Sequence, residues 1–209
     1  MPDSAPVSRY AVLVPVKPPA VGKSRLRGLG LDQRRALAEA FALDTVTACR
    51  SAECVDAVLV VTDDVAFSAR LSGLGAAAIP DGVTGDLNGT LRQAAAEAHR
   101  RWPHLTPVAL CADLPALRGD ELDQVLARTA DGGPWFVSDA DGVGTTLYVA
   151  PYDSFTPRFG PGSRAAHLDS GAREVMGAAR SVRRDVDDLQ DLRDAIALGV
   201  GTHTAAAAP

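Results

Sequence analysis

The chain has 209 residues, of which 46% are hydrophobic and 22% are charged, a composition typical of a globular domain with one hydrophobic core. Its net charge is −5, and the basic residues are scattered among acidic ones, so no cationic stripe is available for a nucleic-acid backbone. We therefore expect no nucleic-acid partner.

The cysteines and the ends of the chain bear on the cellular compartment. Cys49, Cys54 and Cys111 are odd in number and form no C-x-x-C pair, so neither a disulfide framework nor a zinc knuckle is indicated. The first ten residues lack the apolar run of a secretory signal, and no apolar stretch is long enough to span a bilayer. These features predict a cytoplasmic protein with no membrane partner. We expect residues 1–9 and 202–209 to be flexible tails.

The first two-thirds of the chain alternates apolar, β-branched runs with segments of helical periodicity. The runs lie at 11–16, 57–61, 76–79 and 108–112, and helices are expected over 32–49, 87–101 and 119–130. Asp32 is placed to cap the first helix. The alternation is typical of βαβ units and predicts a mostly parallel central sheet flanked by helices.

The last third of the chain has a different pattern. Shorter strands are expected at 135–138 and 146–150, on either side of residues 139–142, which have the composition of a hairpin turn. This pattern predicts a small β insertion in the C-terminal part of a single-domain, Rossmann-like α/β fold over residues 1–209. Ligands of such open sheets bind at the carboxyl ends of the strands.

A basic loop follows the first predicted strand and contains Lys17, Lys23 and Arg25. It is not a phosphate-binding P-loop, because Lys17 stands where that motif requires glycine, and because Pro18 and Pro19 lack backbone N–H groups. Its cations can neutralise a triphosphate and a departing pyrophosphate, which makes these three residues catalytic candidates. The alternative is an exposed basic loop.

Three aspartates are candidate ligands of Mg²⁺. Asp113 directly follows a predicted strand, where it is placed either to bind a metal or to cap a helix. If residues 181–186 are extended, Asp185 and Asp187 point to the same face, and two such carboxylates repel each other unless a cation lies between them. The alternative is that Asp187 or Asp188 caps a helix over 189–198.

Two short stretches are suited to binding an anion. Residues 159–163 read F-G-P-G-S ahead of a short helical segment, and they can place a backbone N–H and the Ser163 hydroxyl on a phosphate. A plain turn is the alternative. Gly144, Thr145 and Thr146 similarly offer a tight approach and hydroxyl donors.

The order of these motifs resembles that of the CofC/FbiD family, guanylyltransferases of coenzyme F-420 biosynthesis that act on 2-phospholactate or phosphoenolpyruvate. The resemblance runs from about residue 10 to residue 198. It is carried by P-V-K at 15–17, K-S-R-L at 23–26, L-N at 87–88, A-D-L-P at 112–115, G-T-T at 144–146, F-G-P-G-S at 159–163 and D-V-D at 185–187.

The resemblance implies roles for individual residues. Thr145, Gly160 and Ser163 would bind phosphoenolpyruvate, and Asn88 would contact the base or the ribose of the nucleotide. The divalent metal would be held by Asp113, Asp185 and Asp187. The implied reaction transfers GMP from GTP to phosphoenolpyruvate, giving enolpyruvyl-diphospho-guanosine and pyrophosphate.

Other functions remain open from the sequence. Within the family, 2-phospholactate or 3-phosphoglycerate is an alternative acceptor. A transferase for molybdopterin or a sugar phosphate would share the sheet and the metal site, and a non-catalytic GTP-binding module would share the nucleotide site. A homodimer paired through a sheet edge or the late hairpin is also left open.

Overall fold

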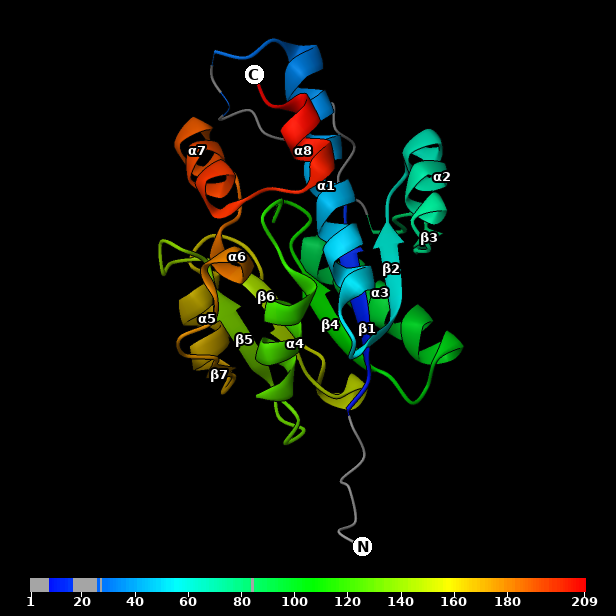
Figure 1. Cartoon of the computed structure of the whole chain (residues 1–209). Helices are drawn as coiled ribbons and strands as arrows, with labels where there is room; N and C mark the ends of the chain where they lie inside the picture. Colours follow the sequence, from blue (N-terminus) through cyan, green and yellow to red (C-terminus); the bar gives the residue numbers. More distant parts are fainter. Residues whose placement is uncertain (1–7, 17–25, 27, 84) are drawn as a thin grey trace, which may run out of the picture.

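One seven-stranded sheet runs through the computed structural model, which describes residues 8–16, 26, 28–83 and 85–209 (Figure 1). The order of the strands is β3-β2-β1-β4-β6-β5-β7. The first four strands run parallel to one another: β1 (Tyr10–Pro15), β2 (Val55–Val61), β3 (Ala77–Ile79) and β4 (Thr106–Leu110). The predicted mostly parallel sheet is thus confirmed.

The last three strands extend this sheet beyond β4. Strand β6 (Thr145–Val149) is antiparallel to both β4 and β5 (Trp135–Ser138), and β7 (Arg173–Glu174) is parallel to β5. Because β6 is reversed relative to β4, its amino end lies beside the carboxyl end of β4. The short strands expected late in the chain therefore continue the main sheet and bring Thr145 to the edge formed by the carboxyl ends of the parallel strands.

Helices cover both faces of the sheet because the side chains of each strand alternate between two cores. On one face, Val12 and Val14 share a core with residues of α1 (Leu31–Ser51), α2 (Val65–Gly73) and α4 (Gly119–Ala127). On the other face, Leu13 packs with the apolar side of α3 (Leu87–Arg101). None of the helices formed by the described residues combines the length and apolar composition needed to cross a membrane.

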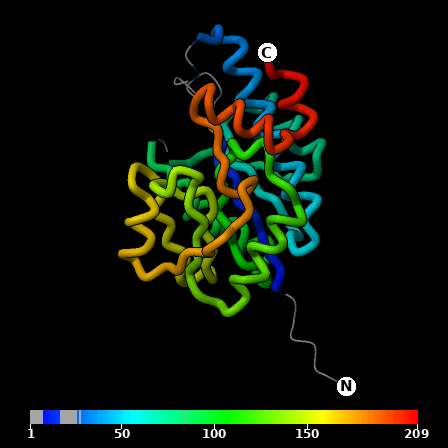
Figure 2. The backbone as a smooth tube through the Cα atoms, turned by 60° about the vertical axis from the view of Figure 1, so that its left-hand side comes forward, coloured from blue at the N-terminus to red at the C-terminus, as the bar shows by residue number. Residues whose placement is uncertain are grey.

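The C-terminal part adds short helices. They are η1 (Tyr152–Ser154), α5 (Ser163–Asp169), α6 (Arg180–Arg183), α7 (Leu189–Leu198) and α8 (Thr202–Ala207). Helix α8 lies beside α1 (Figures 1 and 2). The carboxylate of Asp44 in α1 accepts hydrogen bonds from the backbone N–H groups of His203 (3.1 Å) and Thr204 (2.7 Å). Residues 202–207, part of the tail expected to be flexible, thus form a helix whose first turn is capped by Asp44.

Two expectations about local structure are wrong: the helix cap at Asp32 and the extended segment over 181–186. The first residue of α1 is preceded by Gly30, which makes no side-chain cap, and Asp32 lies inside the first turn. Residues 181–186 are not extended, because α6 occupies their first half and an irregular segment follows. By contrast, the helix expected over 87–101 has the bounds predicted for it, and α4 ends three residues earlier than expected, at Ala127.

Candidate active site

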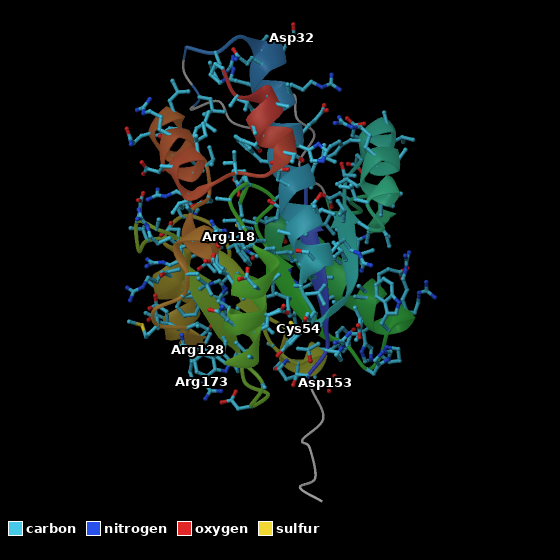
Figure 3. All side chains as sticks on the ribbon, in the orientation of Figure 1. Asp32, Cys54, Arg118, Arg128, Asp153 and Arg173 are labelled. Atoms are coloured by element: carbon cyan, nitrogen blue, oxygen red, sulfur yellow. The ribbon has the colours of Figure 1, made fainter. Side chains whose placement is uncertain are left out.

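The candidate site lies at the carboxyl ends of the parallel strands, on the side of the molecule that carries α7 and α8 in Figure 1. The opposite end of the sheet is where Figure 3 labels Cys54, Arg128, Asp153 and Arg173. Asp113 comes three residues after the end of β4. Asp113 thus lies at the carboxyl end of the fourth strand, as its position in the sequence predicted.

Asp113 is held in place by the backbone on either side of it. The hydroxyl of Thr45, buried in α1, accepts a hydrogen bond from the Leu114 N–H (3.1 Å) and lies 3.2 Å from the Ala112 carbonyl. Thr45 thus contacts the residue before and the residue after the aspartate. These two contacts fix the path of the chain after β4 and therefore the position of Asp113. Sequence reasoning missed Thr45, because a threonine within a helix gives no local signal of such a contact.

The segment with the other two aspartates lies next to Asp113. The backbone N–H of Val186 donates to the carbonyl of Asp113 at 3.1 Å, which joins the D-V-D segment to the end of β4. The start of α7 holds the other side of the segment, where the carboxylate of Asp191 accepts from the N–H groups of Asp187 (3.0 Å) and Asp188 (3.1 Å). Backbone hydrogen bonds, and not a β-strand, therefore position Asp185 and Asp187.

Asp188 is the cap of α7. Its carboxylate accepts from the N–H groups of Gln190 (2.7 Å) and Asp191 (3.0 Å), and with Asp191 it forms a capping box. The expected helix over 189–198, with a cap at 187 or 188, is confirmed. Since Asp188 supplies the cap, Asp187 is not needed for that purpose, and it is exposed.

The electrostatics show that several carboxylates converge here. The pKa of Asp185 is raised to about 7, chiefly by the loss of water around the carboxylate and also by the negative charges of Asp113, Asp187 and Asp139. Within the described residues, no three His, Cys, Asp or Glu side chains are arranged so that they could hold a metal ion as they stand. The donor set is nevertheless all oxygen, as a hard cation requires, and a cation would relieve the repulsion that raises this pKa.

Asp139 is an acidic residue of this site that sequence reasoning treated only as part of a turn. Its two carboxylate oxygens accept from the N–H groups of Val143 (2.9 Å) and Gly144 (2.7 Å), which closes the β5–β6 hairpin. A Cβ atom at Gly144 would meet the Asp139 carboxylate at 2.3 Å, so a larger residue there would displace this carboxylate. The hairpin therefore places Thr145, the next residue, beside the carboxylates.

Thr145 begins β6 and is tied to the acidic segments through its neighbours. The backbone N–H of Cys111 donates to the Thr146 carbonyl (2.9 Å), which aligns the start of β6 with the end of β4. The Thr146 hydroxyl donates to the Val182 carbonyl in α6 (2.7 Å), just before Asp185. Thr145 itself is nearly buried.

The glycine turn lies against the same strand. Gly160 and Gly162 adopt φ values of 136° and 69°, which favour glycine, and the Ser163 N–H closes the turn by donating to the Gly160 carbonyl (3.1 Å). Ser163 is buried at the start of α5. The N–H of Arg164 donates to the Val143 carbonyl (3.1 Å), so the turn and the hairpin are joined directly. The structure thus brings Thr145, Gly160 and Ser163 into one region.

Asn88 connects this turn to α3. Its side-chain amide donates to the Phe159 carbonyl (2.9 Å), and its amide oxygen accepts from the Phe159 N–H (2.8 Å). Asp86 caps the helix by accepting from the Gly89 N–H (2.9 Å). The structure therefore gives Asn88 a positioning contact that the sequence did not predict, and contact with a nucleotide remains a prediction.

The basic loop with Lys17, Lys23 and Arg25 lies outside the described residues, but the residues on either side of it are described. The Val16 N–H donates to the Val61 carbonyl (2.8 Å) at the end of β1. On the far side, Leu26 is fully buried in a cluster with Val186, the central residue of D-V-D. Both ends of the loop are thus anchored beside the site.

A cleft opens next to these anchors, at the carboxyl ends of β1, β2 and β3. Its lining includes Val16, Asp63, Asp81, Leu87 and Thr90. Asp81 is fixed because its carboxylate accepts from the Thr90 hydroxyl (2.8 Å) and the Val83 N–H (2.9 Å). Polar groups thus line a concave surface at this edge of the sheet.

Comparison with solved structures agrees with the fold. A 4-diphosphocytidyl-2C-methyl-D-erythritol synthase superposes with a TM-score of 0.60 at 15% identity, covering 91% of this chain and 98% of the other. Rv0371C of Mycobacterium tuberculosis H37Rv, in complex with manganese, superposes with a TM-score of 0.54 at 19% identity over 91% of this chain and 99% of the other. The chain therefore shares the fold of these two structures.

Comparison of sequences identifies the family within this fold. The family model described as guanylyl transferase CofC like matches residues 10–206, and the chain belongs to this family. Proteins named phosphoenolpyruvate guanylyltransferase are 48% identical in Thermomonospora curvata (95% of this chain, 88% of the relative) and 49% identical in Streptomyces scabiei (96% of each). The expected family and the expectation of a nucleotidyltransferase enzyme are confirmed.

Proposed function

We propose that the protein is a phosphoenolpyruvate guanylyltransferase of coenzyme F-420 biosynthesis, which uses GTP and releases pyrophosphate. The proposal rests on the family and on relatives of nearly half-identical sequence that carry this name. The structural observation that carries it is the Val186–Asp113 hydrogen bond, which joins the two acidic segments beside the start of β6. We propose that the single domain of residues 1–209 contains the whole site.

We further propose that Asp113, Asp185 and Asp187 hold Mg²⁺, with Asp139 close enough to add to the negative field. A structural neighbour was solved with manganese, which supports a divalent metal in this fold. A bound Mg²⁺ would screen the repulsion between the nucleotide and the acceptor phosphate. The three carboxylates would hold that cation, and Asp185, whose pKa is raised, would give up its proton when the cation binds.

Thr145, Gly160 and Ser163 would bind the phosphate of phosphoenolpyruvate and hold it in line with the α-phosphorus of GTP. This phosphate is ionised at neutral pH, so its oxygen can attack without a general base. Lys17, Lys23 and Arg25 would stabilise the departing pyrophosphate. Catalysis then consists of positioning and charge stabilisation.

The cleft at the ends of β1, β2 and β3 would receive the nucleoside of GTP. Its lining includes Leu87, and the next residue, Asn88, contacts the glycine turn. Asn88 therefore stands between the proposed nucleotide and acceptor positions, where it can contact the ribose or the base. In this arrangement the attacking phosphate and the GTP phosphates would meet close to the proposed metal ligands.

An acceptor panel tests the function. Purified protein is incubated with GTP and Mg²⁺ together with phosphoenolpyruvate, 2-phospholactate, 3-phosphoglycerate or a sugar phosphate, and pyrophosphate is measured. We expect the largest kcat/KM with phosphoenolpyruvate. Preference for another acceptor would reassign the substrate. GTP binding without pyrophosphate release from any acceptor would identify a binding module instead.

A further inference from the structure

A histidine that no motif pointed to lies under the glycine turn. His167, in α5, has no exposed surface. Its ring packs between the aromatic rings of Tyr148, Phe136 and Phe159, with centroid distances of 4.8, 5.3 and 5.6 Å. Phe159 directly precedes Gly160, so the ring supports the turn from within the core.

The hydrogen bonds of His167 determine which ring nitrogen carries the proton. The backbone N–H of Arg158 donates to Nε2 at 3.0 Å, and a backbone amide can only donate, so Nε2 carries no proton. A neutral ring must then carry its proton on Nδ1. Burial agrees with a neutral ring, since it lowers the pKa of His167 to about 4.

The protonated nitrogen faces Thr145. Nδ1 lies 3.0 Å from the Thr145 hydroxyl oxygen, and its proton is shared with the backbone of Ser163, which accepts a hydrogen bond from the ring. Because Nδ1 already carries a proton, it cannot accept one from Thr145, and the hydroxyl oxygen must act as the acceptor. The hydroxyl hydrogen of Thr145 is therefore not used by the histidine.

We propose that His167 is a positioning residue for the acceptor phosphate: its Nδ1–H directs the Thr145 hydroxyl hydrogen toward the substrate, while Nε2 holds Arg158 at the start of the glycine turn. The proposal rests on the proposed function. An ionised phosphate offers only acceptor oxygens, so it needs a donor at Thr145. With the proton on Nε2 instead, Thr145 would donate to Nδ1 and present lone pairs to the phosphate.

The tautomer can be measured directly on the wild-type chain. Long-range ¹H–¹⁵N correlation NMR of the histidine rings distinguishes a protonated from an unprotonated nitrogen. We expect His167 to show a protonated Nδ1 and an unprotonated Nε2 from pH 6 to pH 8. A proton on Nε2 would overturn the proposal whether or not the acceptor has been identified correctly.

Steady-state kinetics test whether His167 affects binding of the acceptor. His167→Phe keeps a buried ring and removes both nitrogens, and we expect it to raise KM for phosphoenolpyruvate about tenfold, with KM for GTP changed less than twofold. Because His167 acts through Thr145, adding His167→Phe to Thr145→Val should cost much less than its effect in the wild type. His104→Phe, at an exposed position, is the control.

The outcomes separate the two proposals. Equal changes in KM for both substrates, or fully multiplicative effects in the double variant, would overturn the positioning role of His167. If His167→Phe does not fold, the tautomer measurement on the wild type decides. A wild type that makes no product from phosphoenolpyruvate would reject the proposed function, whereas the NMR result would still test the hydrogen-bond arrangement.

Discussion

The backbone N–H of Val186 donates to the carbonyl of Asp113, and this hydrogen bond brings together two acidic segments from distant parts of the chain. The side chain of Val186 is fully buried in a cluster with Leu26, at the far end of the basic loop. The same residue thus links the proposed metal ligands to the anchor of the proposed phosphate-binding loop.

Removing one carboxylate charge tests the metal site. We expect Asp187→Asn to abolish GTP-dependent pyrophosphate release, a loss of at least about 10²-fold, and to leave the fold intact because the side chain is exposed. Asp153→Asn, at the opposite end of the sheet in Figure 3, is the matched control. Normal turnover by a folded Asp187→Asn protein would rule out its role as a ligand.

The raised pKa of Asp185 gives a prediction about stability. Its folded-state value of about 7 lies above the ordinary value of 3.8, so the contribution of Asp185 to stability is full below pH 4 and is lost as the pH rises toward 7. In metal-free protein at pH 8, Asp185→Asn should therefore raise Tm by about 5 °C. It should also reduce the rise in Tm that Mg²⁺ causes in the wild type. Thermal melts with and without Mg²⁺ measure both, and a lower Tm for the metal-free variant at pH 8 would contradict this account.

The pH dependence of stability that arises from His167 has the opposite sign to that of Asp185. The pKa of His167 is lowered to about 4, chiefly because the ring is buried and to a smaller extent because of the positive charge of Arg158. The stability that depends on a neutral ring is present above pH 6.5 and is lost as the pH falls through 4. Between pH 7.5 and pH 5, the wild type should lose about 1–2 kcal/mol more free energy of unfolding than His167→Gln. Urea titrations at the two pH values measure the difference. Equal losses would show that the ring is not kept neutral.

Thr45 should matter although it is not at the substrate. Thr45→Val removes the acceptor for the Leu114 N–H and should cost about 1–3 kcal/mol of stability and reduce kcat, since Asp113 loses its support. Thr47→Val is a matched control on the same helix, because the Thr47 hydroxyl donates to the Leu43 carbonyl of that helix (2.8 Å). Similar kinetics for the two variants would show that Thr45 does not support Asp113.

The basic loop contains both lysines of the chain, Lys17 and Lys23. If the loop stabilises the departing pyrophosphate, Lys23→Ala should lower kcat by about 10²–10³. Amine-selective labelling followed by mass spectrometry offers an independent measurement, because only these two side chains and the N-terminus can react. GTP with Mg²⁺ should protect both lysines. Full labelling in the presence of GTP, together with a normal rate for Lys23→Ala, would identify an exposed surface loop.

The pattern of apolar residues predicted the elements whose formation depends on residues that are close in sequence. The strand runs and the helix over 87–101 follow from periodicity, and Asp113 follows from its place after a strand. The pattern could not predict that α8 would pack on α1, since the capping contact of Asp44 spans most of the chain. It also could not reveal His167 or Thr45, whose hydrogen bonds join segments that are adjacent only in the folded protein.

The most direct test is ³¹P NMR of a reaction containing the wild-type protein, GTP, Mg²⁺ and phosphoenolpyruvate. The account predicts that the signals of GTP and phosphoenolpyruvate decrease together, and that a new diphosphate ester and pyrophosphate appear in equal amounts. Release of GDP and inorganic phosphate, or an unchanged phosphoenolpyruvate signal while GTP is consumed, would contradict it.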